Sequence, residues 1–535
     1  MFDHLRSTSP EVLRKLVPIQ GDIMLPGLGV STEDAATIIA RVSVVFHAAA
    51  TVKFDEALKL SLQMNVLGTK RLVELCHRMD KLVALVHVST AYCNCDRGEV
   101  KEEVYPPPTD PYKLIQLVDW MDDDTFNHLT PKLIGSRPNT YTYTKALAEH
   151  LLVQEAASLP LVIVRPSIVA AAWREPLPGW VDNLNGPTGL IVGAGKGMLR
   201  TLHCRGELVA DLIPVDIPIN LLIVAAWHTA MHRKNELVVY NCVSGMERPV
   251  RWGEINEHGM SALRRNAMND VVWYPNLHFT QHKTLNTIAV LLQHWLPAYL
   301  MDAAARLAGK RPIMVRIAQK LDRAASCLEY FTTHEWRFSN DNVQSLWSQL
   351  SFQDQHTFNF ALSALHWPTY MEQYCLGTKR YVMKEELATL PSARKHLTKM
   401  FWMDLATRMV GVAALAAPVF LALTSHPPSP DVVGSTDVEG TGGVGSVASL
   451  SPQDLVDCGC SVSIDQANII PVGVTLQPAP VTSWIPLLTD GGVFSKAAAA
   501  YTKPLPAAQQ PVIVVPRRLL LLPPPFKKPG QPTGL

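Results

Sequence analysis

Three mainly apolar runs, separated by segments of helix-forming sequence, constrain the fold of this chain more than any other feature. The runs lie at 42–50, 82–90 and 159–169 and are rich in Val, Ile, Leu and Ala. Runs of this length without polar alternation are typical of strands buried on both faces of a parallel sheet. A long helix is predicted between the first two, from Glu56 to Met79. The alternation of strand and helix predicts a parallel α/β sheet in the first half of the chain.

Several shorter segments complete this pattern. The segment Lys15–Ile23 is predicted as a short strand that ends in a turn, and Ser31 is predicted to cap a helix that continues through 35–40. Further elements are expected as a helix that begins near Asn139, an apolar helix over 220–230 and a strand over 236–241.

Tyr141 and Lys145 are candidates for proton-transfer chemistry. In a helix, residues four apart lie on one face, one turn from each other. An ammonium beside a phenol stabilises the phenolate and lowers the pKa of the tyrosine. Such a tyrosine exchanges a proton near neutral pH, as hydride chemistry at a carbonyl requires. Because an exposed amphipathic helix gives the same spacing, this pair alone is weak evidence.

Small and polar residues follow the predicted strands, where ligands bind in open parallel sheets. Ala48, Ala49 and Ala50 leave room for a flat cofactor, although tight packing of a helix on the sheet explains them equally well. Ser89 and Thr90 place hydroxyl groups at the end of the next strand, and ordinary turn chemistry is their alternative. Asp22 follows the first predicted strand, where a helix cap is the alternative.

Composition excludes several classes of protein. A net charge of +1, with 18% charged residues, argues against a nucleic-acid binder. The cysteine pairs Cys93/Cys95 and Cys458/Cys460 are spaced by one residue, a poor fit to structural zinc, so we expect no metal site and mostly reduced thiols. Residues 1–14 are polar and charged, which is not typical of a signal peptide.

The motifs together resemble an extended short-chain dehydrogenase/reductase. Longer sequence segments resemble, more specifically, the alcohol-forming fatty acyl-CoA reductases. The general motifs are Gly21-Asp22, His47-Ala48-Ala49, Asn65-Val66-Leu67-Gly68-Thr69, Val88-Ser89-Thr90-Ala91-Tyr92, Tyr141-xxx-Lys145 and Val164-Arg165-Pro166-Ser167. The segments that resemble these reductases specifically lie at 45–56, 175–183 and 211–216. The resemblance runs from about Leu13 to about Phe401, with a helical region at 331–383.

The resemblance implies a Rossmann-like doubly wound sheet and a two-step, NADPH-dependent reduction of fatty acyl-CoA to the alcohol through the aldehyde. Tyr141 would protonate the alkoxide, Lys145 would lower the pKa of Tyr141 and hold the nicotinamide ribose, and Thr90, with Ser89 beside it, would bind the carbonyl oxygen. The cofactor-binding residues implied are Asp22, Ile23, Ala48, Ala49, Lys145, Pro166 and Ile168. Lys196 or Arg200 is a candidate for a CoA phosphate.

One departure from the family concerns the cofactor. The family opens with a strand, a GxGxxG-type loop and a helix that bind the pyrophosphate. No such glycine pattern precedes Lys15, and Gly193–Gly197 lacks the Ser/Thr of a P-loop. We therefore expect an N-terminally truncated chain, lacking the first βαβ unit, that binds NADPH poorly. The alternatives are another extended dehydrogenase, acting on a sterol or a nucleotide sugar, and a non-catalytic remnant.

The expected domains are a reductase domain with its substrate part at 1–270, a helical domain at 271–400, a possible membrane segment at 401–425 and a disordered Pro/Gly-rich tail at 426–535. Ile288–Leu292 is too short to span a bilayer; a buried core helix is favoured over a surface on a membrane or an acyl tunnel. The uncharged run Met409–Ser425 favours membrane association. The family implies an intracellular membrane of the peroxisome or endoplasmic reticulum; no pattern predicts the oligomeric state.

Overall fold

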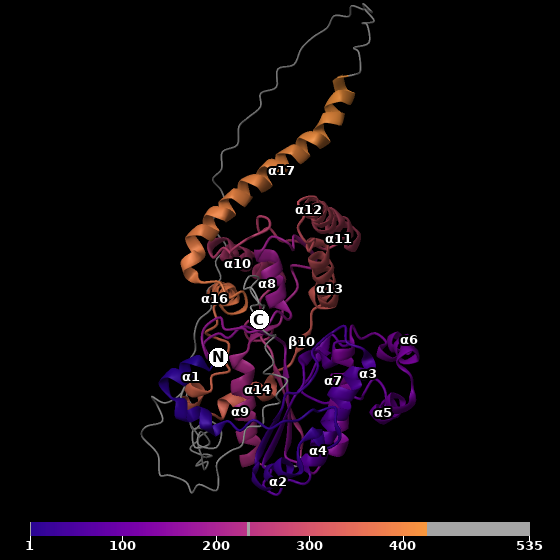
Figure 1. Cartoon of the computed structure of the whole chain (residues 1–535). Helices are drawn as coiled ribbons and strands as arrows, with labels where there is room; N and C mark the ends of the chain where they lie inside the picture. Colours follow the sequence, from indigo (N-terminus) through magenta and orange to yellow (C-terminus); the bar gives the residue numbers. More distant parts are fainter. Residues whose placement is uncertain (1, 233–235, 425–535) are drawn as a thin grey trace, which may run out of the picture. The chain divides into compact units, whose positions relative to one another are not determined.

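The structure, a computed structural model, describes residues 2–232 and 236–424, which divide into two compact units between Asp404 and Leu405. The first unit is built on a four-stranded parallel sheet (Figure 1). Its strands, in spatial order, are β1 (Val44–His47), β2 (Ala84–Val88), β4 (Leu161–Pro166) and β8 (Val238–Cys242). The parallel α/β sheet predicted from the apolar runs is thereby confirmed.

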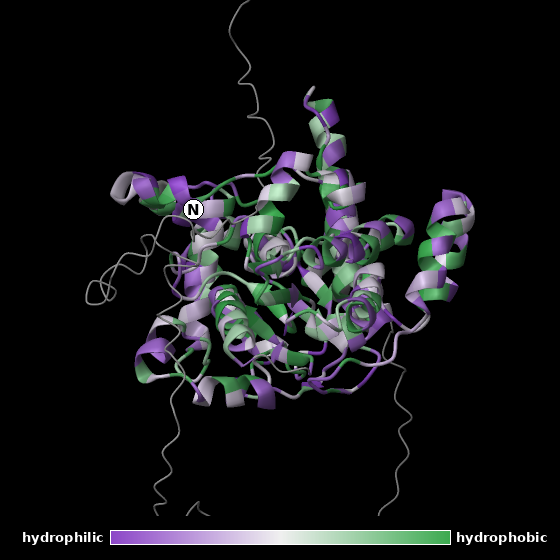
Figure 2. Ribbon diagram, turned by 90° about the horizontal axis from the view of Figure 1, so that it is seen from below, coloured by the Kyte–Doolittle hydropathy of each residue, from purple (hydrophilic) through white to green (hydrophobic). Residues whose placement is uncertain are grey.

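Helices cover both faces of this sheet, so its central strands are buried on both sides. Alternate residues of β2 and β4 belong to two different apolar clusters: Val86 and Val164 pack with Leu221 of α9 (Asp216–Met231), whereas Leu85 packs with Leu152 of α7 (Thr140–Glu155). The strands at the centre of Figure 2 are accordingly hydrophobic in colour.

The helices predicted around the first three strands are present, with the expected caps. α2 (Thr32–Arg41) begins after Ser31, whose side chain accepts a hydrogen bond from the Asp34 backbone N–H. The predicted helix over 56–79 is α3 (Leu58–Leu62), the π-turn η3 (Gln63–Leu67) and α4 (Gly68–Cys76). Asn139 caps α7 by accepting from the Thr142 N–H at 2.9 Å.

Two predictions about the start of the chain are wrong. The run 42–50 forms only a four-residue strand, and its Phe46 is 39% exposed because β1 is the edge of the sheet in the described chain. The segment Lys15–Ile23 joins none of the sheets of the described residues. It follows a short 3-10 helix, η1 (Pro10–Lys15), and its end folds into a turn in which the Asp22 N–H donates to the Leu28 carbonyl at 2.7 Å.

Three two-stranded parallel sheets surround the main one: β3 (Glu99–Val100) with β10 (Arg337–Phe338), β5 (Ile168–Ala170) with β7 (Leu212–Pro214), and β6 (Thr201–His203) with β9 (His278–Thr280). The predicted strand over 159–169 is therefore divided between β4 and β5. The shorter helices of the first half are α1 (Asp3–Thr8), η2 (Pro26–Gly29), η4 (Ala91–Asn94), α5 (Pro111–Trp120), α6 (Asp123–Ile134) and α8 (Pro187–Gly195).

The second half is helical, as predicted. Its elements are α10 (Trp252–Arg265), α11 (Lys283–Val290), η5 (Leu291–Trp295), α12 (Leu296–Leu307), α13 (Met314–Thr333), α14 (Asp341–Ser348), α15 (Phe352–Thr357), α16 (Trp367–Gly377), η6 (Thr378–Val382), η7 (Leu387–Thr389) and α17 (Leu390–Thr424). The prediction that Ile288–Leu292 forms a buried core helix is wrong: Ile288 is 54% and Leu292 59% exposed.

The Pro178-Gly179-Trp180 segment lies against this helical region. Gly179 has φ +75° and meets the backbone of Gln373 and Gly377 so closely that neither glycine has room for a Cβ atom. The tight contact joins a segment of the first half to α16 and requires glycine on both sides.

The predicted membrane segment falls on α17, which extends to Thr424. Within the described residues, no helix combines the length and the apolar character that a bilayer crossing needs. Ser425, the predicted disordered tail at 426–535, Cys458 and Cys460 lie outside the described residues.

Candidate functional site

Helix α7 positions Tyr141 in its first turn and Lys145 one turn later. The Lys145 ammonium is buried and donates a hydrogen bond to the Val88 carbonyl at 2.7 Å, at the carboxyl end of β2. Since Lys145 makes no other hydrogen bond within the described residues, two of its N–H groups remain for a ligand. The sheet and α7 thus bring the predicted Tyr–Lys pair to the edge where ligands bind in this class of fold.

Thr90 and Ser89 follow β2 directly and differ in their surroundings. The Thr90 hydroxyl lies near the phenol of Tyr141, whose pKa it lowers, and accepts the Tyr92 N–H at 3.3 Å. The Ser89 hydroxyl is buried and has no partner within the described residues. Thr90 is therefore the hydroxyl that lies beside Tyr141.

A cluster of aromatic rings packs beside Tyr141, which is half-buried. Phe54 stacks on Tyr141 at 5.8 Å between ring centroids, and Phe331 of α13 packs beside Phe54 at 5.4 Å. Tyr92 meets Phe331 edge to face at 5.1 Å. The C-terminal half thereby contributes a side chain to the surroundings of a residue from the first half.

This enclosure changes the expected pKa of Tyr141. Burial raises the pKa of Tyr141 well above its ordinary value, and the nearby Thr90 hydroxyl lowers it only in part. The prediction that Lys145 lowers the pKa of Tyr141 is wrong for this arrangement, because desolvation dominates. Tyr141 is protonated at neutral pH and so is an acid, able to give a proton.

Burial also acts on Lys145, whose pKa is lowered from 10.5 to about 8 by desolvation, against the opposing effect of the Glu149 carboxylate. At neutral pH the side chain remains an ammonium. Its charge has little water around it, which strengthens its interaction with any group brought next to it.

A buried ion pair supports the helix one turn beyond Lys145. Glu149 accepts two hydrogen bonds from Arg165 of β4, at 2.8 and 2.7 Å, and one from the Cys93 thiol at 3.3 Å. The same guanidinium donates to the Lys101 and Glu103 carbonyls, at 3.0 and 2.7 Å. Glu149 and Arg165 are both buried, so this pair ties α7 to the sheet.

Two buried histidines lie under this end of the sheet. His47 and His87 face each other across β1 and β2 with 5.0 Å between ring centroids, and His47 Nε2 contacts the Thr69 hydroxyl at 2.9 Å. Desolvation, with the charge of Lys145, lowers the pKa of His47 to about 3 and lowers that of His87 as well. Both rings are neutral at physiological pH.

The predicted cofactor-binding residues fall into two groups. Ala48 and Ala49 follow β1, and Pro166 ends β4, so these residues lie with Lys145 at the carboxyl edge of the sheet; Ile168 begins β5 directly after it. Asp22 and Ile23 are separate: their loop packs on α4, where Arg71 donates to the Ile23 carbonyl at 3.1 Å.

The residues present therefore fit the nicotinamide–ribose end of a dinucleotide. The fit rests on a buried ammonium with donors to spare, beside a phenol and two hydroxyl groups.

Lys196 and Arg200, candidates for a CoA phosphate, are already paired in the structure. Lys196 contacts the Glu385 carboxylate at 2.9 Å, and Arg200 contacts Asp404 at 3.0 Å. These contacts join α8 and the chain after it to the C-terminal helices and give both residues a structural role.

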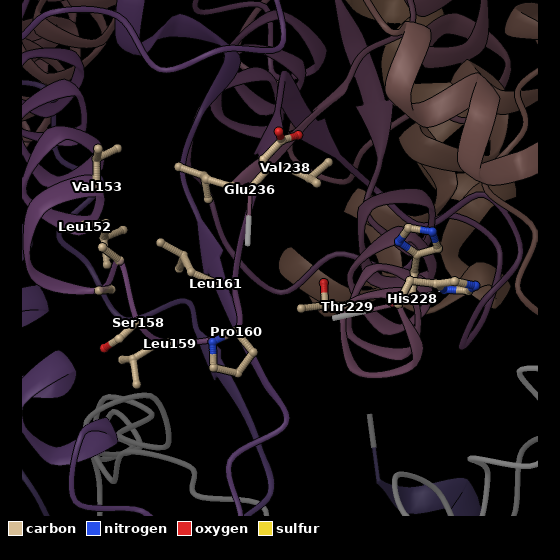
Figure 3. Close-up of a pocket in the computed structure, with 14 residues that line it drawn as sticks. Leu152, Val153, Ser158, Leu159, Pro160, Leu161, His228, Thr229, Glu236 and Val238 are labelled. Atoms are coloured by element: carbon tan, nitrogen blue, oxygen red, sulfur yellow. Dashed lines mark hydrogen bonds between the residues drawn. The ribbon is translucent and has the colours of Figure 1, made fainter. Parts of the chain in front are cut away.

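A cavity of about 370 Å³ lies at the opposite edge of the sheet, where β4 and β8 begin. Its lining includes Leu161, Val238, His228 of α9 and His232, which follows the end of α9 and stacks on His228 (Figure 3). It contains none of the predicted site residues. No group of metal-binding side chains is found in the described part of the chain, and Cys93 and Cys95 are buried free thiols there.

Sequence reasoning did not assign roles to Phe54, Phe331, Glu149 or Arg165. Glu149 could have been suspected, because it follows Lys145 by four residues and so shares a helix face with Tyr141. No local pattern signals Phe331, which lies 190 residues beyond Tyr141.

Comparison with known proteins adds to this geometry. Family models described as Male sterility protein match residues 1–222 and 293–385. Fatty acyl-CoA reductase 1 of Xenopus laevis is 48% identical over 400 residues, which cover 75% of this chain and 78% of that protein. The Homo sapiens reductase 1 is 46% identical and the Mus musculus reductase 2 is 41% identical, with the same coverage. Among solved structures, the terminal R domain of the myxalamid PKS-NRPS pathway has a TM-score of 0.42 at 17% identity, covering 68% of this chain and 74% of that one.

Proposed function

This chain belongs to the fatty acyl-CoA reductases, oxidoreductases that form fatty alcohols, and we propose that it reduces long-chain acyl-CoA in two NADPH-dependent steps through the aldehyde. The balance is one acyl-CoA, two NADPH and two protons in, and one alcohol, one free CoA and two NADP⁺ out. The first step breaks the C–S bond, and the second reduces the aldehyde carbonyl.

Tyr141 is proposed as the proton donor. NADPH, when bound, would supply a hydride to the carbonyl carbon. The Tyr141 phenol would give its proton to the carbonyl oxygen, where negative charge develops. A reduction needs the phenol in its protonated form, and Tyr141, whose pKa lies above its ordinary value, is protonated at neutral pH. The stacked ring of Phe54 helps to exclude water from this proton transfer.

Thr90 and Lys145 are proposed to orient the reaction. The Thr90 hydroxyl, near the phenol of Tyr141, would share the developing charge of the substrate oxygen. Lys145, held by the Val88 carbonyl, would use its remaining N–H groups on the nicotinamide ribose. Ser89, Ala48, Ala49, Pro166 and Ile168 would line the path of the cofactor, and Asp22 with Ile23 would meet the adenine.

The single observation that carries the assignment of the site is the contact of Thr90 with Tyr141, one helical turn from Lys145, at the carboxyl end of β2. It brings an acid, an orienting hydroxyl and a fixed positive charge to one place. The substrate class, fatty acyl-CoA, is proposed because the chain belongs to the fatty acyl-CoA reductases.

The activity test uses the purified chain with palmitoyl-CoA and with either NADPH or NADH, and detects aldehyde and alcohol by mass spectrometry. We expect slow formation of hexadecanol, faster with NADPH than with NADH, because no glycine-rich loop precedes Lys15 and NADPH binding is expected to be weak. Tyr141→Phe keeps the shape of the ring and loses the proton donor, so turnover should fall about a hundredfold or more while NADPH binding survives. Full activity of this variant, or turnover of sterols or sugar nucleotides in place of acyl-CoA, would contradict the assignment.

We further propose association with an intracellular membrane, peroxisomal or of the endoplasmic reticulum, through the apolar end of α17. The exposed side chains of Met409, Val410 and Val412 support it, because water solvates such a helix face poorly. Deletion of 409–425 should move the expressed protein from the membrane fraction to the soluble fraction. A soluble intact chain would contradict the proposal.

A further inference from the structure

The continuous helical stretch of α11, η5 and α12, called here the outer helix (283–307), has its amphipathic pattern reversed. A surface helix normally turns its apolar side inward. Here no residue of α11 or η5 is buried, and α12 buries only Ala298 and Asp302. The exposed large apolar residues, from 41% at Met301 to 92% at Leu307, are Leu285, Ile288, Leu291, Leu292, Leu296, Tyr299, Leu300, Met301 and Leu307.

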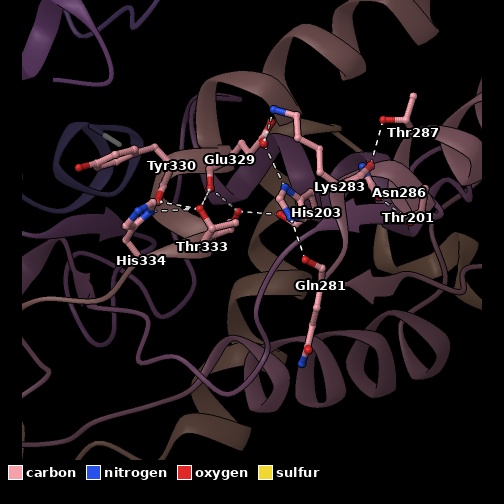
Figure 4. A network of polar contacts seen from close by, with 11 residues as sticks. Thr201, His203, Gln281, Lys283, Asn286, Thr287, Glu329, Tyr330, Thr333 and His334 are labelled. Carbon is pink, nitrogen blue, oxygen red and sulfur yellow. Dashed lines mark hydrogen bonds and ion pairs between the residues drawn. The ribbon is translucent and has the colours of Figure 1, made fainter. Parts of the chain in front are cut away.

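Polar side chains hold the outer helix to the rest of the first unit. Lys283 pairs with Glu329 of α13 at 2.8 Å, and Asn286 accepts from the Thr201 hydroxyl at 2.9 Å (Figure 4). Further along, His294 Nε2 accepts the Arg200 backbone N–H at 2.9 Å. These contacts fix the helix by its polar side, so its apolar side remains outward.

Asp302 attaches the end of the outer helix to the next one. Its carboxylate accepts the backbone N–H groups of Ile313, Met314 and Val315 at 2.9, 2.8 and 3.0 Å and so caps α13. Asp302 is buried, and it is the one acidic residue in the sequence from 283 to 321. The only negative charge of this region is therefore turned away from solvent.

Apart from Lys283, which pairs with Glu329, the exposed charges from 283 to 321 form one group of cations, and the exposed Asp322 follows this stretch. The exposed cations are Arg306, Lys310, Arg311, Arg316 and Lys320. These cations lie in the last turn of α12, in the connecting loop and in the first turns of α13. This segment, called here the basic loop (306–320), stands out in a chain whose net charge is only +1. Trp295 and Tyr299 stack on the outer helix at 6.0 Å between centroids, and such amphipathic rings favour the interface between water and lipid.

From this arrangement we propose that the outer helix and the basic loop form a docking surface for an anionic phospholipid bilayer. The apolar side chains enter the boundary between headgroups and acyl chains, and the basic loop contacts the anionic headgroups. The surface consists of other residues than those at the end of α17, and membrane binding by it does not depend on the reduction reaction. It would bring the chain to the lipid phase that holds long acyl chains.

Charge complementarity favours a bilayer over a second copy of this chain. An isologous contact would place the basic loops of two copies on the same apolar patch, where like charges repel. An anionic membrane, in contrast, can bind both the exposed apolar side chains and the positive charges of this surface.

The test is vesicle co-sedimentation of the full chain, with phosphatidylcholine vesicles that contain either about a third phosphatidylserine or none. Ile288→Asn with Leu292→Asn should weaken binding to the anionic vesicles at least about tenfold, because two exposed apolar anchors are lost. Lys310→Glu with Arg311→Glu should weaken it about twenty-fivefold, since each basic side chain near such a surface contributes about fivefold. The charge pair should leave the weaker binding to neutral vesicles unchanged.

Matched control variants separate this surface from general stickiness. Trp120→Gln with Phe352→Asn removes apolar side chains that are 71% and 86% exposed elsewhere, and Arg78→Glu with Lys81→Glu reverses a distant exposed basic pair. Both controls should bind vesicles as the wild type does. All the substituted positions are exposed, and circular dichroism checks that each variant is folded.

Wild-type vesicle binding by both surface variants would overturn the proposal. Unchanged vesicle binding, with a shift from dimer to monomer by Ile288→Asn/Leu292→Asn in sedimentation velocity, would overturn it in favour of a second copy. Because these assays do not measure reduction, their outcome is independent of the proposed activity.

Discussion

Replacing Lys145 by Met should separate the stability of this protein from its activity. The buried Lys145 ammonium is desolvated, and its pKa falls from 10.5 to about 8. At about 1.4 kcal/mol per pKa unit, carrying this charge in the folded state costs about 3 kcal/mol below pH 8. Met keeps the length of the side chain without the charge. Loss of the hydrogen bond to the Val88 carbonyl costs about 1–3 kcal/mol in the opposite direction.

The dependence on pH isolates the charge. Below pH 8 the lysine is protonated in both the folded and the unfolded state, and the folded state bears the full cost. Between pH 8 and 10.5 the unfolded state binds the proton more tightly, so the wild type gains stability relative to Lys145→Met as the pH rises. The gain in the unfolding free energy of the wild type should reach about 3 kcal/mol. The hydrogen bond to the Val88 carbonyl contributes at both ends of this pH range and leaves only a smaller offset in the difference.

The assay is urea unfolding of both proteins at several pH values from 7 to 10.5, followed by circular dichroism, with the difference in unfolding free energy plotted against pH. Titration of other groups occurs in both proteins and cancels in the difference. In parallel, the variant should lose at least about a hundredfold in acyl-CoA reduction, if Lys145 holds the ribose as proposed. A free-energy difference that does not change with pH would refute the claim that Lys145 is charged and desolvated.

Two further predictions concern stability alone. Glu149→Gln leaves the Arg165 guanidinium buried without its counter-charge and should lower the unfolding free energy by about 3–5 kcal/mol, whereas Asp123→Asn, at an exposed ion pair, should change it by less than about 1 kcal/mol; equal losses in urea titrations would contradict this reasoning. Gly377→Ala should cost about 3 kcal/mol or more in thermal unfolding, because its Cβ would collide with backbone, while Gly98→Ala meets nothing and serves as the control; a stable Gly377→Ala variant would exclude the tight contact.

Local sequence determined much of the sheet. The runs that form β2 and β4 carry no polar alternation because both faces of these strands are covered. In the structure, successive residues of each strand pack alternately into one and the other of two apolar clusters. Asn139 could be expected to start α7 because its side chain satisfies a free N–H of the first turn. The pairing of Tyr141 with Lys145 then follows from helix geometry.

Other features depend on tertiary contacts that no local pattern contains. Phe54 and Phe331 come together over Tyr141 only when the two halves of the chain fold, and this enclosure, not the neighbouring ammonium, sets the pKa of Tyr141. Apolar composition also wrongly indicated burial at Ile288–Leu292, because the polar residues Asn286 and His294 determine which side of the helix is held inward.

Helix α13 has a consequence for how the length of this chain can vary. Its first turn is capped by Asp302, and near its other end Phe331 packs beside Phe54. One inserted or deleted residue between these points would turn the two ends relative to each other by about 100° and shift them by about 1.5 Å. Phe331 would then leave the ring of Phe54, although no residue of the site had been changed. Natural variants should therefore differ in length in the loop around Gly309, before α13 begins, and keep the count of residues within α13 constant.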